Sequence, residues 1–344
     1  MFNKILINKT NLLNNLRFLK NLKPNAKICV MVKANAYGHG VDEIVECLKE
    51  QDLTFGVSSQ EEAFYLRKLT NKDIIIFGAV DKYEDLINND IQFALFSFEQ
   101  LKNIINIAKK IKNKPKMHLC LNTGMNRYGI KTKSEFLKIT RLLQKHGIIL
   151  AGLYTHFSSL TTDSLYTKMQ EEKFYKFCKL LPKKSTIVKH VGGGRTIFSG
   201  IEADMYRVGI EVYGYGNENL KPVMSVISQI VDIVKVKKNE HIGYLCGFTA
   251  SKNMIVGAVP IGYADGLPRK LSNYLIVTKS NESYSNVGNV CMDCFMLDTK
   301  GELRIGDKIC VMDNANKLAE IIGTSEYEVL TNFGHARCVR IIVE

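Results

Sequence analysis

The chain has 344 residues, 46% of them hydrophobic, which is enough for two domains or for one large barrel with an appended domain. This balance excludes a disordered chain, a collagen-like repeat and a small disulfide-stapled protein. The longest apolar runs fall far short of the ~20 residues of a membrane span, and the first ten residues lack the features of a signal peptide. We therefore expect a cytoplasmic protein with no membrane partner.

Basic residues outnumber acidic ones by 47 to 34, which gives a net charge of +13. The lysines are scattered along helix-like segments without an Arg-rich block or a nucleic-acid motif, so we expect a solvated basic surface and no nucleic-acid partner. The nine cysteines are odd in number and several lie in apolar runs, which is typical of reduced thiols. Cys291 and Cys294 form a C-x-x-C pair, but no second pair accompanies it, and we predict no metal site.

Residues 5–7 read as a strand, and the first two thirds of the chain then alternate between short apolar runs and amphipathic segments. Eight strand-like runs are expected at residues 28–34, 54–58, 73–78, 93–97, 117–122, 150–156, 186–192 and 205–213. Helical stretches are expected at residues 41–50, 59–69, 98–111, 134–146 and 166–180. This order favours an α/β fold, a (β/α)8 TIM barrel, over an open doubly wound sheet.

The pattern changes after about residue 222, where strand-like runs dominate. They are expected at residues 223–237, 254–260, 274–279 and 308–312, with one short helix at 315–322. We therefore predict three parts. Residues 1–10 form an N-terminal strand that packs with the β domain, residues 11–222 form the (β/α)8 barrel, and residues 223–344 form a β-rich C-terminal domain.

A barrel of this kind carries its chemistry at the carboxyl ends of its strands. Lys33 ends the first predicted strand, Arg127 follows the fifth, His156 ends the sixth and Arg207 lies on the eighth. The apolar run before Lys33 predicts a lowered lysine pKa, which suits Schiff-base chemistry, but it also fits a lysine whose stem is buried and whose amine reaches water. Taken singly, the two arginines also fit ion pairs at the barrel mouth, and His156 fits a core histidine.

Six motifs, in order along the chain, resemble those of the bacterial alanine racemases. They are VKANAYGHG at residues 32–40, TGMNRYG at 123–129, YTHF at 154–157, RVGI with YG at 207–214, GY at 243–244 ahead of GYADG at 262–266, and CMD at 291–293. The resemblance implies pyridoxal 5'-phosphate as cofactor and alanine as substrate. It also implies a homodimer with active sites shared between subunits, which supplies D-alanine for peptidoglycan.

The resemblance also implies roles for individual residues. Lys33 would bind the cofactor and act as one catalytic base, and Tyr244 would be the other base, supplied across the dimer. Arg207 would face the pyridine nitrogen, His156 would pack behind the ring, and Arg127 would steer Tyr244 and the substrate carboxylate. Because an arginine cannot protonate that nitrogen, Arg207 would favour racemisation over transamination or decarboxylation.

The remaining implied contacts hold the phosphate and close the site. Phosphate contacts are expected from Tyr37, Gly193, Gly194, Gly209 and Ile210. Substrate contacts are expected from Tyr263 and Met292, supplied by the second subunit.

Three positions depart from the family pattern. Cys120 stands where many members carry a carbamylated lysine that fixes the motif arginine, so that task falls to another group, with a bound anion or Asn122 as candidates. Gly193 and Gly194 replace an Asn-Ser pair, although backbone N–H groups of a triple-glycine loop can still bind a phosphate. The C-terminal tyrosine that often reaches the phosphate in this family is not evident, and His335 is the candidate to replace it.

Other functions remain open at this point. A racemase of broader specificity and a related pyridoxal-phosphate decarboxylase of barrel fold fit much of the same pattern. A non-catalytic protein that carries the cofactor on the same barrel is a third reading, which the β-rich tail and Tyr244 disfavour.

Overall fold

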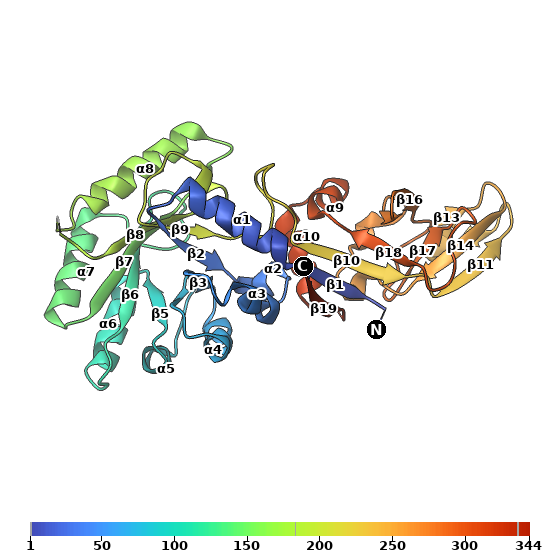
Figure 1. Cartoon of the computed structure of the whole chain (residues 1–344). Helices are drawn as coiled ribbons and strands as arrows, with labels where there is room; N and C mark the ends of the chain where they lie inside the picture. Colours follow the sequence, from blue (N-terminus) through green and yellow to red (C-terminus); the bar gives the residue numbers. More distant parts are fainter. Residues whose placement is uncertain (1, 183, 336) are drawn as a thin grey trace. The chain divides into compact units, whose positions relative to one another are not determined.

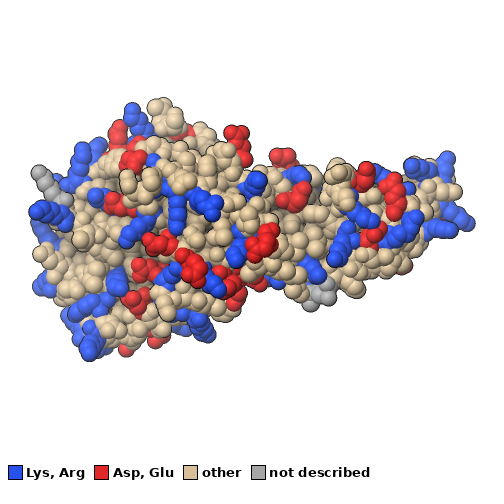
Figure 2. Space-filling model, viewed as in Figure 1, with Lys and Arg blue, Asp and Glu red and all other residues tan. Residues whose placement is uncertain are grey.

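The computed structural model describes residues 2–182, 184–335 and 337–344. The chain divides into two compact units, one of residues 14–34 and 48–220 and the other of residues 1–13, 35–47 and 221–344. No helix in these described ranges is long and apolar enough to cross a membrane. Lys and Arg side chains are spread over the visible face and are interrupted by acidic ones (Figure 2).

The first unit is the predicted barrel. Its eight strands run parallel and close on themselves in chain order (Figure 1). They are β2 (Lys27–Met31), β3 (Thr54–Val57), β4 (Ile74–Ile76), β5 (Gln92–Leu95), β6 (Lys116–Cys120), β7 (Ile149–His156), β8 (Val188–Gly192) and β9 (Met205–Val208). The last strand is shorter than predicted, because the chain turns after Val208 and Val212 donates its N–H to Gly209 O.

Helices cover the outside of these strands (Figure 1), and all of them except α5 lie where the amphipathic segments predict a helix. They are α4 (Gln60–Leu69), α5 (Tyr83–Asn88), α6 (Phe98–Ala108), α7 (Lys133–Lys145) and α8 (Ser164–Cys178). Ser59 and Thr132 cap α4 and α7 with reciprocal hydrogen bonds to a glutamate three residues on. Three more helices lie in the first fifth of the chain, α1 (Lys9–Leu22), α2 (Lys33–Tyr37) and α3 (Val41–Leu48).

The second unit is mostly β, as predicted. Its largest sheet has the order β16-β15-β18-β10-β1-β19, in which β1 (Lys4–Asn8) runs antiparallel to β10 (Met224–Gln229) and parallel to β19 (Val339–Val343). The sheet is completed by β15 (Ile276–Lys279), β16 (Glu282–Ser285) and β18 (Lys308–Met312). The smaller sheets contain β11 (Asp232–Val236), β14 (Met254–Val259), β17 (Phe295–Asp298), β12 (His241–Ile242) and β13 (Phe248–Thr249). Helix α9 (Ala315–Ile322) matches its predicted range, and α10 (Glu326–Asn332) was not predicted.

Candidate functional site

Lys33 begins α2, two residues beyond the end of β2, and is therefore on the carboxyl rim of the barrel. It is partly buried, and its pKa is lowered by burial first and by the nearby charge of Arg127 second, against a smaller opposing effect of Glu62. Glu62 also holds the turn, since its Oε1 accepts the Ala34 N–H at 2.6 Å. A lowered pKa increases the neutral fraction of the amine, which is the form that attacks a carbonyl or accepts a proton.

The residues that follow Lys33 form a left-handed turn. Ala34, Asn35, Ala36 and Tyr37 have φ values of 51°, 52°, 52° and 54°. This conformation costs roughly 1–2 kcal/mol per non-glycine residue, and such strain is concentrated at functional sites in proteins. Only Asn35 is a residue type that favours it, so residue types alone do not predict a left-handed conformation here. Tyr37 is buried, with its ring 5.9 Å from that of Tyr327.

Arg207, on β9, is buried with its guanidinium group beside two aromatic rings. The carbon Cζ lies 4.9 Å from the Phe77 ring centroid and 4.7 Å from that of Tyr154. Its Nη2 donates to Thr155 O at 2.8 Å and lies 3.5 Å from His156 Nδ1. Burial lowers the pKa of Arg207, but a guanidinium group remains charged at neutral pH. The cation therefore has a fixed place in the barrel interior.

A single chain of hydrogen bonds continues from Arg207 through the barrel. Arg207 Nη1 lies 2.9 Å from His190 Nδ1, and His190 Nε2 lies 2.8 Å from His118 Nδ1. His118 Nε2 lies 2.8 Å from Gln92 Oε1, and Gln92 Nε2 donates to Asp73 Oδ1 at 3.0 Å. Because the arginine can only donate, each next group is forced to accept on one side and donate on the other. Both histidines are thus assigned as neutral with the proton on Nε2.

The alternation of side chains along the strands, together with two glycines, makes room for this series of hydrogen bonds inside the barrel. Arg207, His190 and His118 occupy inward-facing positions of their strands, where side chains of a barrel normally pack as apolar layers. Glycines opposite them provide space, since a Cβ at Gly152 would lie 2.1 Å from His118 Nδ1 and one at Gly192 would lie 2.6 Å from Arg207 Nη2. Sequence reasoning did not single out His118 or His190. Polar residues at inward positions of predicted barrel strands were the available signal.

His156 ends β7 and is partly buried. Its pKa is lowered to about 3, by burial first and then by the charges of Arg207, Arg127 and Lys33. The ring is therefore neutral at physiological pH. Its predicted place behind a cofactor ring remains a prediction.

The glycine loops after β8 and β9 lie on the same rim as Lys33, because β9 pairs with both β8 and β2. Gly193 has φ +125°, and a Cβ there would lie 2.5 Å from Phe157 O, so only glycine fits. The N–H groups of Gly194 and Ile210 find no acceptor within the described ranges. The Gly209 N–H, in contrast, donates to the Glu211 carboxylate at 2.8 Å.

Cys120 is buried, and burial raises its pKa to about 11, so the thiol is neutral and supplies no charge to hold Arg127. Asn122, the other candidate for that task, accepts the N–H of Asn126 on its Oδ1 at 3.1 Å. Arg127 itself is exposed, with its guanidinium carbon 6.0 Å from the Tyr128 ring centroid.

Tyr244 and Tyr263 begin two short 3-10 helices of the second unit, η2 (Tyr244–Cys246) and η3 (Tyr263–Asp265), and Met292 lies in a nearby loop. Tyr263 donates its N–H to Cys291 O, next to Met292, and Tyr244 O accepts from Asn289 Nδ2 at 2.8 Å. Their side chains are 71%, 43% and 53% exposed, and Leu245 beside them is 85% exposed. Large apolar side chains gathered on a surface are typical of a protein interface.

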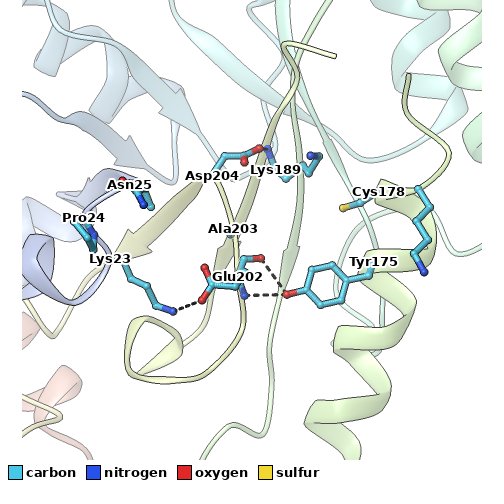
Figure 3. Close-up of a pocket in the computed structure, with 11 residues that line it drawn as sticks. Lys23, Pro24, Asn25, Tyr175, Cys178, Lys189, Glu202, Ala203 and Asp204 are labelled. Carbon is cyan, nitrogen blue, oxygen red and sulfur yellow. Dashed lines mark hydrogen bonds and ion pairs between the residues drawn. The ribbon is translucent and has the colours of Figure 1, made fainter. Parts of the chain in front are cut away.

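Two cavities differ in their relation to these residues. One of about 290 Å³ is lined by Tyr263 and by the exposed His335, among others, so the structure brings these two predicted residues together. The other, of about 650 Å³, lies where β2, β8 and β9 begin, the end of the barrel opposite Lys33. Figure 3 shows its Lys23–Glu202 ion pair and the contacts of Tyr175 with Glu202. None of the predicted catalytic residues lines it.

Comparisons with known proteins cover nearly the whole chain. Residues 7–217 match the family model described as alanine racemase, N-terminal domain, and residues 223–342 match the model of the C-terminal domain. The chain is 33% identical to the alanine racemase of Borreliella burgdorferi, over 96% of this chain and 94% of that protein. It is 28% identical to the alanine racemase of Francisella philomiragia, over 99% of this chain and 100% of that protein.

Solved structures agree with these relatives. The alanine racemase of Clostridium difficile superposes with a TM-score of 0.93 at 29% identity, over 100% of this chain and 96% of that one. The alanine racemase of Bartonella henselae, solved with covalently bound pyridoxal phosphate, gives a TM-score of 0.89 at 25% identity, with both chains fully covered.

Proposed function

This chain belongs to the alanine racemase family, and we propose that it interconverts L- and D-alanine with pyridoxal 5'-phosphate. The observation that carries the proposal is the amine of Lys33, which has a lowered pKa and shares the barrel rim with the buried Arg207 and the open amides of the glycine loops. We further propose that the protein acts in the cytoplasm and supplies D-alanine for peptidoglycan.

The residues present fit this cofactor. The neutral amine of Lys33 suits a covalent bond to an aldehyde, and the N–H groups of Gly194 and Ile210 are free to donate to a phosphate. No hydrogen bond within the described ranges uses the Nε–H of Arg207, which leaves one donor for a ring nitrogen. When bound, the cofactor supplies an electron sink for the α-carbon of the substrate.

Racemisation requires that a proton leave one face of the α-carbon and return on the other, so two groups must flank it. We assign the proton on one face to Lys33 Nζ and the proton on the other to the phenol oxygen of Tyr244. Arg207 donates a hydrogen bond but holds its own proton, so it does not add a charge to a ring nitrogen. Because the ring nitrogen gains no charge, return of a proton to the α-carbon is favoured over loss of the substrate carboxylate, and this disfavours the decarboxylase alternative.

The exposure of Tyr244 supports a shared site. A tyrosine that accepts a proton near neutral pH needs neighbouring groups that tune its pKa, yet this side chain is 71% exposed in the single chain and lies among exposed apolar neighbours. We propose that a homodimer buries this surface and brings Tyr244 of the partner subunit to Lys33. Tyr263 and Met292 would approach the substrate from the same surface.

The test uses the purified protein with added pyridoxal phosphate. Borohydride reduction followed by peptide mass analysis should locate the cofactor on Lys33, and chiral chromatography should show both enantiomers of alanine after either is supplied. Lys33→Ala should lose the covalent cofactor and the great majority of racemisation, by more than the ~10²–10⁴-fold typical of one acid–base group. A reducible cofactor that persists in Lys33→Ala would end the assignment.

A further inference from the structure

Glu211 is a buried carboxylate on the rim of the barrel that the proposed reaction does not use. It lies three residues beyond β9, and its side chain is 3% exposed. Burial of a carboxylate is costly unless its oxygens are paired. The hydrogen-bond donors of this carboxylate therefore indicate what the residue does in the structure.

Those partners are backbone amides of two different loops. Glu211 Oε1 accepts the N–H of Arg195 at 2.6 Å, and Oε2 accepts the N–H of Gly209 at 2.8 Å. Arg195 belongs to the loop after β8, and Gly209 to the loop after β9. One side chain thus ties together the loops that leave two adjacent barrel strands.

Arg195, one of the two residues whose N–H groups Glu211 accepts, has an unfavourable backbone conformation. Arg195 has φ +70°, in the left-handed region that a residue with a Cβ seldom adopts. Thr196, next in the chain, closes the turn by donating both its N–H and its Oγ1 to Gly193 O, at 3.0 and 2.6 Å. The bond from Arg195 to Glu211 fixes the direction of the whole turn, and with it the amide of Gly194.

The corner formed by these loops is where barrel enzymes commonly bind phosphate groups. Each amide that Glu211 binds is the neighbour of an amide that finds no acceptor within the described ranges, Gly194 beside Arg195 and Ile210 beside Gly209. We propose that Glu211 is a positioning residue that locks the two loops so that the Gly194 and Ile210 amides point together at the cofactor phosphate. The proposal rests on the proposed function, and it removes the Gly209 N–H from the expected phosphate donors.

Burial raises the pKa of Glu211 above its ordinary value, and the N–H groups that it accepts, together with the nearby guanidinium charge of Arg195, oppose that rise. Both carboxylate oxygens are engaged by these N–H groups. Loss of the carboxylate would leave two buried amides without acceptors and free the loops to move apart. The expected consequence is confined to the phosphate end of the cofactor.

The test compares pyridoxal phosphate with pyridoxal, which lacks the phosphate, by equilibrium titration of the wild type, Glu211→Ala and Glu211→Gln. Glu211→Ala should weaken binding of pyridoxal phosphate at least tenfold, about 1.4 kcal/mol, and change binding of pyridoxal less than about twofold. Glu211→Gln preserves the volume but has one acceptor oxygen, so it should lose part of this discrimination. Glu218→Ala, an exposed glutamate of the same segment, should bind both compounds as the wild type does.

Three results would overturn the inference. They are unchanged or tighter binding of pyridoxal phosphate by both Glu211 variants, equal loss of both compounds, and loss in the Glu218 variant as well. If Glu211→Ala does not fold, the Glu211→Gln result decides alone. A wild type that fails to bind pyridoxal phosphate would instead overturn the proposed function and this inference with it.

Discussion

Arg207 illustrates how much of this barrel is arranged around one side chain. Two aromatic rings lie near its guanidinium group, and one series of hydrogen bonds leads from it through two histidines and a glutamine to Asp73. Since every group in the chain has a defined donor and acceptor side, the direction of Arg207 is set by residues far from the rim. A buried polar chain that is fully paired specifies one arrangement more sharply than apolar packing does.

This arrangement predicts the protonation of His118 and His190. Burial lowers the pKa of His118 to about 3 and that of His190 well below its ordinary value. In the folded protein the ¹⁵N resonances of both rings should therefore show the neutral form with the proton on Nε2, unchanged between about pH 5 and pH 8. The same protein in denaturant is the control, where every histidine should titrate near ~6.5.

The sign of the pH effect on stability follows from the same shifts. Below ~6.5 the unfolded chain binds protons on these histidines that the folded chain does not, so the free energy of unfolding should decrease as the pH falls from about 6.5 toward 3. Above that window this contribution is constant. Ring resonances that titrate near neutral pH in the folded state would contradict both expectations.

At the scale of single elements, the sequence predicted where the site residues lie along the strands better than it predicted which side chains meet across strands. The predicted strands placed Lys33 and His156 at strand ends, Arg127 after a strand and Arg207 on a strand. In the structure Lys33, His156 and Arg207 lie at or next to the carboxyl ends of parallel strands, and Arg127 lies in the segment that follows β6. The pairing of His118 with His190 depends on the register of β6, β7 and β8, which local patterns do not contain. The role of Glu211 depends in the same way on two loops that are separate in the sequence.

Helix boundaries show a second limit. Helix α1 was not predicted, because its asparagines and lysines obscure the apolar face formed by Leu12, Leu16 and Leu19. The strand predicted to continue to residue 213 ends at Val208, since apolar content alone does not reveal the turn that begins at Gly209. Buried residues in a tight turn resemble a buried strand in sequence.

A glycine in β7 provides the prediction at this scale. Gly152→Ala would place a methyl group 2.1 Å from His118 Nδ1, so the His118–His190 bond must break or the strands must separate. We expect a loss of about 1–3 kcal/mol in the free energy of unfolding, measured by urea denaturation. Gly200→Ala is the matched control, because a Cβ there meets nothing within 4 Å and should leave stability nearly unchanged. Equal stability of the two variants would mean that the barrel interior is not close-packed around the histidines.

At the scale of the whole molecule, the residues assigned to one reaction are divided between two compact units. Lys33 and Arg207 belong to the barrel unit, whereas Tyr244, Tyr263 and Met292 belong to the β-rich unit. The tyrosine and its neighbours are exposed on that unit, which gives an apolar surface in need of a partner. Both observations are explained if each active site takes its barrel residues from one subunit and its tyrosine from the other.

Complementation of inactive variants tests this division. Lys33→Ala and Tyr244→Phe should each have very little racemase activity alone. A heterodimer of the two contains one site with both substitutions and one site with neither, so a two-fold symmetric dimer regains one intact site. After random exchange of equal amounts, activity should recover to about one quarter of the wild-type value, because about half of the dimers are mixed and each has one working site of two.

Subunit exchange must be shown independently, with a mass tag on one variant, for the recovered activity to be interpreted. A doubly substituted Lys33→Ala/Tyr244→Phe protein mixed with either single variant serves as the control, because every possible site in those mixtures lacks at least one base. Recovery in the first mixture alone places the lysine and the tyrosine of one site on different chains. Demonstrated exchange without recovery would mean that both groups come from the same chain, and the exposed surface around Tyr244 would then need another explanation.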